Sequence, residues 1–129
     1  MSATMESIRD YLQGDPDVCL AYVFGSIATG RANLHSDLDV AVSTKTELSP
    51  ERKAAMVGDL ASLTGRPVDL IDLRRAGEPL LGEILRDGRR LKGSHSQHVE
   101  LVQRHIYNCE DFLPIVRRLL SERRQQWIR

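Results

Sequence analysis

The amino-acid sequence predicts a small α/β domain in which a mixed β-sheet is flanked by helices. Three observations carry this prediction. Short apolar runs at 18–24, 36–43 and 67–73 are typical of strands. Segments with the apolar spacing of helices lie before, between and after these runs, which is the alternation of an α/β chain. After position 94, apolar residues recur at steps of three and four, which indicates a long C-terminal helix.

The 129 residues are expected to form one domain, 1–129, with a core over 1–93 and a C-terminal helical segment over 94–129. A domain of this size buries roughly two-thirds of its chain surface, which suffices for a core without disulfides. Lys plus Arg and Asp plus Glu number 18 each, so the formal net charge is zero. We therefore expect no direct nucleic-acid binding, because proteins of that class usually carry a basic face.

Cysteine usage and the absence of targeting signals predict the compartment. Cys19 and Cys109 lie within apolar patterns and show no CxxC spacing, so we expect two buried free thiols, as in a reducing cytoplasm. The N-terminus has no basic segment followed by an apolar one, and no apolar run approaches membrane-spanning length. We therefore expect a cytoplasmic protein without membrane contact.

Helix and strand signals follow one another in a regular order. The predicted elements are a helix over 2–13, a strand over 18–24, a short turn or helix from 25, a strand over 36–43, a helix over 50–64, a strand over 67–73, a helix over 79–87, an edge strand over 89–92 and a helix over 95–127. Ser49 is the expected N-cap of the helix over 50–64, and Gly65 its C-cap. Met56, Leu60 and Leu63 are expected on one face of this helix.

Two aspartates interrupt the apolar strand over 36–43. Asp37 and Asp39 alternate with Leu38 and Val40, so the two carboxylates share one face of a strand and the apolar side chains share the other. Carboxylates on a strand that is otherwise core are costly unless a cation compensates them. Oxygen-only ligands suit Mg²⁺. The alternative is a surface turn followed by a strand with one polar face.

A glycine and a serine end the preceding apolar strand. Gly25 allows the backbone to approach a ligand closely, and the hydroxyl of Ser26 can donate to a phosphate oxygen. Amide groups at the start of the turn that follows favour an anion. A phosphate cradle that faces a metal-binding carboxylate pair predicts phosphoryl chemistry.

Gly25-Ser26, ten further residues and then Asp37-x-Asp39 resemble the signature of the nucleotidyltransferase superfamily that includes DNA polymerase beta. With little beyond this core, the chain is most similar to the minimal nucleotidyltransferases (MNT) of prokaryotes, the MntA-type antitoxins of HEPN/MNT toxin–antitoxin modules. The resemblance implies the polymerase beta-like palm fold and a protein adenylyltransferase activity (EC 2.7.7.-). It also implies ATP as the donor, and a tyrosine of a cognate HEPN toxin as the acceptor of AMP within a hetero-oligomer.

The resemblance implies a third catalytic carboxylate on the strand over 67–73. Asp69 and Asp72 are the candidates, and their odd spacing places them on opposite faces of a regular strand. The pattern of the family favours Asp69, which leaves Asp72 as a strand-end or capping residue. Asp37, Asp39 and Asp69 would then hold two Mg²⁺ ions.

Further residues of the signature are expected to bind the nucleotide. They are Gly25, Ser26, Gly30, Arg31 and Ser36. The family often has a basic residue immediately before its second glycine, where this chain has Thr29, so Arg31 is expected to serve as an imperfect substitute.

The predicted C-terminal helix carries two apolar rows. One row packing on the sheet would leave the other for a partner protein or a second copy, whereas a single wide stripe would wrap the core. Pro114 is expected to bend or divide this helix. His95, His98 and His105 are expected to have no metal-ligand constellation around them.

Two other functions fit parts of the sequence. An antitoxin could inactivate its partner mainly by binding, without turnover. A small-molecule nucleotidyltransferase of the aminoglycoside-modifying kind needs an acceptor pocket, for which the residues after 94 are a poor source. DNA polymerase activity is the function that we expect least, because the sequence shows no fingers, no thumb and no net basic charge.

Overall fold

A four-stranded mixed sheet forms the centre of the computed structural model, which describes residues 3–33 and 35–128, with side chains at 4–33, 35–109, 118, 120 and 121. The strand order is β3-β2-β1-β4. The strands are β1 (Val18–Phe24), β2 (Leu38–Thr44), β3 (Val68–Asp72) and β4 (Arg89–Lys92). β1 runs antiparallel to both β2 and β4, whereas β3 pairs with β2 in parallel. The predicted mixed sheet with an edge strand over 89–92 is confirmed.

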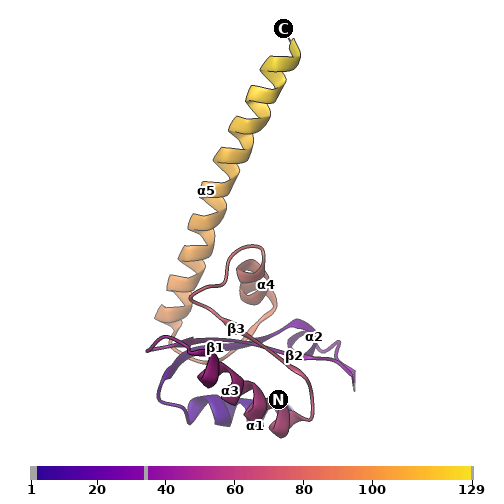
Figure 1. Ribbon diagram of the computed structural model, residues 1–129, viewed down its shortest axis with the longest axis vertical. Helices are drawn as coiled ribbons and strands as arrows, with labels where there is room; N and C mark the ends of the chain where they lie inside the picture. Colours follow the sequence, from indigo (N-terminus) through magenta and orange to yellow (C-terminus); the bar gives the residue numbers. More distant parts are fainter. Residues whose placement is uncertain (1–2, 34, 129) are drawn as a thin grey trace.

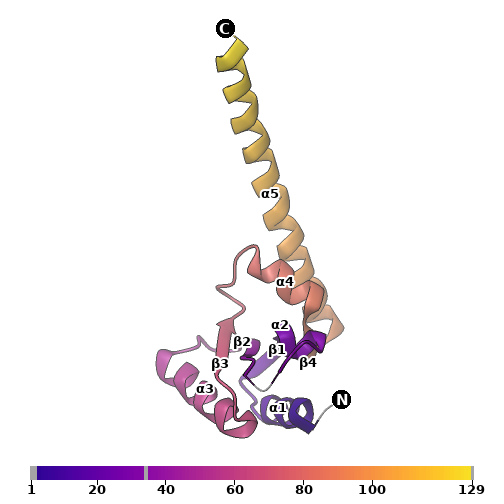
Figure 2. The ribbon, with the colours of Figure 1, turned by 90° about the vertical axis from the view of Figure 1, so that its right-hand side faces the viewer.

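Helices cover both faces of this sheet, as Figures 1 and 2 show. The helices are α1 (Ala3–Gln13), α2 (Gly25–Thr29), α3 (Pro50–Thr64), α4 (Leu80–Asp87) and α5 (His95–Ile128). α1 and α3 cover one face, where they form a core with Leu38, Val40 and other strand residues. α4 and the beginning of α5 cover the other face, where a second core contains Tyr22 and Phe24. Because side chains alternate along β1 and β2, these strands contribute residues to two separate hydrophobic cores.

Local chemistry sets the ends of α3. Ser49 accepts a hydrogen bond from the backbone N–H of Arg52 at 3.1 Å, and Gly65 ends the helix in the left-handed region at φ 67°. Both predicted caps are confirmed. Met56 and Leu60 are buried, whereas Leu63 is 49% exposed. Leu63 lies in the last turn of α3, beyond the part that packs on the sheet.

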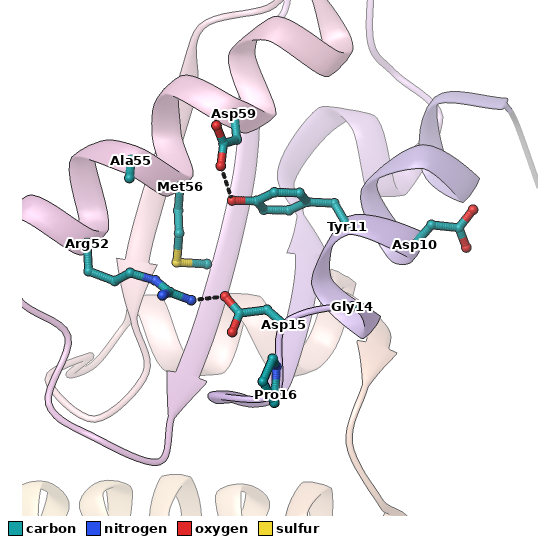
Figure 3. Close-up of a pocket in the computed structure, with 9 residues that line it drawn as sticks. All are labelled: Asp10, Tyr11, Gly14, Asp15, Pro16, Arg52, Ala55, Met56 and Asp59. Carbon is teal, nitrogen blue, oxygen red and sulfur yellow. Dashed lines mark hydrogen bonds and ion pairs between the residues drawn. The ribbon is translucent and has the colours of Figure 1, made fainter.

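A hollow between α1 and α3 is shown in Figure 3. Its polar groups satisfy one another: the hydroxyl of Tyr11 donates to Asp59 Oδ2 at 2.6 Å, and Arg52 pairs with Asp15. Burial, followed by the hydrogen bond to Asp59, raises the pKa of Tyr11 to about 12. This hollow lies on the face opposite α4, and we attribute it to the docking of the two helices.

α5 is a single helix that passes Pro114 without a break, so the alternative that the helix divides there was wrong. Proline removes one N–H donor, and the turns on either side keep their own hydrogen bonds. Leu101 joins the second core, but the helix then projects away from the domain (Figures 1 and 2). Ile106, Tyr107 and Leu120 are 49%, 65% and 58% exposed, which excludes a helix that wraps all of its apolar residues around its own core.

Within the described part of the chain, no helix is long and apolar enough to cross a membrane. Cys19 and Cys109 are free thiols, as predicted, but each is half-buried rather than fully buried. The thiol of Cys19 donates to the carbonyl of Ser43 at 3.2 Å.

Candidate active site

Asp39 and Asp69 lie side by side on the sheet. They are register partners in the parallel ladder between β2 and β3, so their side chains project from the same face. Leu38 and Val40 point into the core beneath α1 and α3, which places Asp39 on the opposite face, toward α4. Asp39 is half-buried and Asp69 is exposed, so the pair lies at an open edge of the domain.

Negative charge is concentrated around Asp39. Burial raises the pKa of its carboxyl, and the charges of Asp69, Asp37 and Glu83 raise it further. Repulsion of this kind is relieved when a cation binds, and an all-carboxylate donor set suits Mg²⁺. Asp37 and Asp69 are therefore both close enough to Asp39 to affect its carboxyl. Their donor chemistry fits the divalent ion that the resemblance implies.

Glu83 is a further acidic residue near Asp39 that the sequence did not lead us to expect. It lies in the first turn of α4, which packs over the same face of the sheet. Its sequence signal was weak, because an acidic residue in the first turn of a helix is ordinary. Only the packing of α4 on the sheet brings it within electrostatic range of Asp39.

The carboxylate of Asp39 leaves no room for a side chain at Gly25. Phe24 pairs with Asp39 in the antiparallel ladder, so Gly25 follows at the very end of β1. Its φ is +73°, and a Cβ added there would lie 2.2 Å from Asp39 Oδ2. Any side chain at position 25 would displace the carboxylate, which is why this turn requires glycine.

The turn after Gly25 is the short helix α2. No side chain caps it at Phe24, and its last residue is followed by Gly30 in the left-handed region at φ 77°. The backbone N–H of Arg31 donates to the carbonyl of Ser26 at 2.9 Å, which closes the turn. Gly25, Ser26, Gly30 and Arg31 are thus held in one compact segment beside Asp39. Their part in nucleotide binding stays a prediction.

Ser36 and Asp37 lie in a loop rather than in the strand that we predicted from residue 36. The hydroxyl of Ser36 accepts from the N–H of Asn33 at 2.9 Å, and Arg66 Nη1 donates to the carbonyls of Asn33 and Ser36 at 2.6 and 3.0 Å. These bonds hold the loop as a turn, so strand pairing starts at Leu38. The expectation that Asp37 and Asp39 alternate along one strand was wrong in this respect, although Asp37 still lies near Asp39.

Asp72 has a local role at the end of β3. Its Oδ1 accepts a hydrogen bond from the backbone N–H of Arg74 at 3.0 Å, and its carbonyl accepts from Arg75 at 3.0 Å. This is the strand-end capping role predicted for it. Asp69, in contrast, is placed opposite Asp39.

The sequence of residues 6–97 matches the family model described as polymerase beta, nucleotidyltransferase. That match covers most of the chain and contains every residue of the site described above. The chain belongs to the polymerase beta nucleotidyltransferase family. The fold predicted from the Gly-Ser and Asp-x-Asp signature is thereby confirmed.

Individual relatives agree with this family. The protein adenylyltransferase MntA of Shewanella oneidensis is 34% identical over 79 residues, which cover 61% of this chain and 57% of the relative. The match thus spans little more than half of that relative's length. A crystal structure of a toxin–antitoxin with AMP-PNP aligns with a TM-score of 0.78 and 25% identity, over 92% of this chain and 96% of that chain. The resemblance to MntA-type minimal nucleotidyltransferases is confirmed.

A further solved structure contains a chain that is 24% identical to this one, so the likeness shows the fold alone. It is a tri-AMPylated Shewanella oneidensis HEPN toxin in complex with an MNT antitoxin. The alignment has a TM-score of 0.67 and covers 91% of this chain and 96% of that chain.

The expectation that His105 has no metal-ligand constellation was wrong. Glu78, His105 and Cys109 bring ligand atoms within 4.8 Å of one another. Helical spacing could have paired His105 with Cys109, but the approach of Glu78 depends on how α4 packs against α5.

Proposed function

We propose that this protein is an Mg²⁺-dependent adenylyltransferase antitoxin, which transfers AMP from ATP to a tyrosine of a cognate HEPN toxin and so neutralises it. The observation that carries the proposal is the placement of Asp39 between Asp69 and the Gly25-Ser26 turn. A curated relative that bears the name protein adenylyltransferase, and a structural relative with bound AMP-PNP, support the same reaction.

Each group of the site has a task in this reaction. Asp37, Asp39 and Asp69 are the residues that would hold two Mg²⁺ ions, which when bound neutralise phosphate charge and lower the pKa of the acceptor hydroxyl. Ser26 and the amides that follow Gly25 would fix the β- and γ-phosphates. Asp69, the more exposed of the ladder pair, would accept the proton of the tyrosine hydroxyl as its oxygen attacks the α-phosphorus.

Few protein groups are needed, because positioning and charge stabilisation account for most of phosphoryl-transfer catalysis. Pyrophosphate leaves as the new bond between the tyrosine oxygen and phosphorus forms. Arg31 is exposed beside α2 and would supply the cation that Thr29 does not. The half-exposed site leaves room for an acceptor side chain that a second protein presents. ATP, Mg²⁺ and two free thiols are compatible with the cytoplasm.

The exposed part of α5 is the surface that we assign to the toxin. Ile106, Tyr107 and Leu120 are exposed large apolar or aromatic residues on a helix that leaves the domain. Exposed apolar residues along one projecting element are typical of protein-binding surfaces. The helix α5 contacts α4, and Glu83 of α4 is close to Asp39. A toxin docked along α5 would therefore lie near the carboxylates.

The test is the intact mass of a co-purified toxin after incubation with ATP and Mg²⁺. We expect mass additions in whole AMP units with the natural protein, and none with the Asp37→Asn/Asp39→Asn double variant. Asp10→Asn changes an exposed aspartate outside the site and is the matched control. A stable complex without any mass change would instead establish an antitoxin that acts by binding, with the exposed Ile106, Tyr107 and Leu120 of α5 as the proposed contact surface. If the toxin is neither bound nor modified, the result favours a small-molecule acceptor.

A further inference from the structure

A second group of metal-ligating side chains lies where the segment before α4 meets α5. His105 Nδ1 is 2.7 Å from Glu78 Oε1 and 3.8 Å from Cys109 Sγ. His105 and Cys109 are four residues apart on α5, so they lie on one face of the helix, one turn apart. Glu78 approaches that face from a distant part of the chain. Carboxylate, imidazole and thiol thus converge on one point.

The surroundings hold two of these groups in place. The backbone N–H of Gly82 donates to Glu78 Oε2 at 3.2 Å, which leaves Oε1 directed at His105. A Cβ at Gly82 would lie 2.9 Å from His105 Cε1 and 3.4 Å from Glu78 Oε2. Glycine at this position therefore makes the room in which the imidazole sits against α4. Outer contacts that orient ligands in this way are typical of protein metal sites.

We propose that Glu78, His105 and Cys109 bind a borderline-soft divalent ion, Zn²⁺ in first place. Thiolate and imidazole ligands select zinc over magnesium, which prefers oxygen. Three protein ligands leave a fourth position for water. This site uses none of the aspartates of β2 and β3, and it does not depend on the proposed transfer reaction.

The distances are compatible with this ion. A tetrahedral zinc ion places a ligating nitrogen and sulfur about 3.5 Å apart, and a nitrogen and oxygen about 3.3 Å apart. The corresponding distances here are 3.8 Å and 2.7 Å. The side chains of His105 and Glu78 are 30% and 26% exposed, so both can make the small adjustment that remains. Binding would release the thiol proton of Cys109, because the thiolate is the ligand, and the proton that His105 Nδ1 shares with Glu78 would have to leave that nitrogen, to Nε2 or to solvent.

Such an ion would fasten α5 to the domain. In the described structure α4 and α5 meet over few residues, and α5 then continues unsupported (Figure 2). A bond network from Glu78 to His105 and Cys109 would fix the direction in which the helix leaves the sheet. Zinc would thereby set the orientation of the exposed residues beyond Cys109.

The test is titration of the full chain with Co²⁺, a zinc substitute whose thiolate complexes absorb in the near ultraviolet. We expect one equivalent to produce a thiolate-to-cobalt band that Zn²⁺ abolishes and Mg²⁺ does not. Cys109→Ser should lose the band, whereas Cys19→Ser, the matched control, should keep it. Gly82→Ala should weaken binding by about 10- to 100-fold, as for other altered supporting contacts.

Two results would overturn the proposal. The first is a natural protein that shows no thiolate band at equimolar Co²⁺, which would leave only a Glu78–His105 ion pair. The second is a band that persists in Cys109→Ser. A thermal shift provides a further check that does not need the cysteine chromophore: Zn²⁺ should raise the Tm of the natural protein, and this rise should be lost in Glu78→Gln.

Discussion

Gly25 and Asp39 form a matched pair: the backbone of the glycine lies where a Cβ would be 2.2 Å from the carboxylate oxygen Oδ2. The antiparallel register of β1 and β2 creates this approach, because it sets Phe24 opposite Asp39. The Gly25-Ser26 turn and the carboxylate of Asp39 are therefore a single structural unit, in which a side chain at position 25 would displace that carboxylate.

Gly25→Ala should abolish the transfer reaction. The new Cβ would push Asp39 aside, and the left-handed backbone would add a strain of about 1–2 kcal/mol. Gly65→Ala is the matched control, because Gly65 has a similar φ of +67° but nothing lies within 4 Å of its added Cβ. Both variants should lose similar stability in urea, and only Gly25→Ala should lose activity. Equal activity in the two variants would contradict the pairing.

Asp69→Asn and Asp72→Asn should separate catalysis from folding. The first variant removes a charge beside Asp39 and should lose at least about 100-fold in transfer rate without loss of stability, in line with removal of one stabilising group. The second should cost about 0.5–1 kcal/mol, because the bond to the N–H of Arg74 is weakened, and should remain active. Transfer rates and urea midpoints check both. The reverse pattern would assign the third carboxylate to Asp72.

Asp39→Asn should raise the Tm of the metal-free protein near neutral pH. Burial and neighbouring carboxylates raise the pKa of Asp39 in the folded state, so its ionised form opposes folding above that pKa. The advantage of the variant should shrink as the pH falls toward 3.8, the ordinary pKa of the group. Mg²⁺ should raise the Tm of the natural protein only. A variant that Mg²⁺ stabilises equally would place the ion elsewhere.

His98 should make stability depend on pH. Burial, then the charges of Arg90 and His95, lowers its pKa below 6.5, and the ring shares a 2.6 Å hydrogen bond with the hydroxyl of Tyr22. The unfolded chain then binds more protons below pH 6.5, so stability is complete above that pH and falls as the pH drops toward the folded pKa. His98→Gln should flatten this dependence, and His35→Gln, in an exposed loop, should not. Unfolding curves between neutral and mildly acidic pH measure both.

The sequence was most informative where local chemistry decides the structure. Ser49 and Gly65 cap α3 through bonds within a few residues. Asp72 also bonds locally, although its capping role was predicted from the family pattern that favoured Asp69. The Gly25-Ser26 break marked the end of β1 correctly, and the apolar runs on either side of it identified β1 and β2. These features depend on contacts that neighbouring residues supply.

Features that depend on distant contacts were not predictable in the same way. The strand with Asp39 starts at Leu38 because Arg66 reaches back to the loop before it. Glu83 approaches Asp39, and Glu78 approaches His105, only because α4 packs across the sheet and α5. No periodicity in a single sequence reports such approaches.

The most direct test of the proposed function is transfer of labelled phosphate from ATP to the co-purified toxin. With the natural protein and Mg²⁺, we expect label from the α-phosphate of ATP to become bound to the toxin, and label from the γ-phosphate to remain in solution. Neither label should be transferred by the Asp37→Asn/Asp39→Asn variant. Transfer of the γ-label, or full transfer of the α-label by that double variant, would contradict adenylyl transfer at these carboxylates.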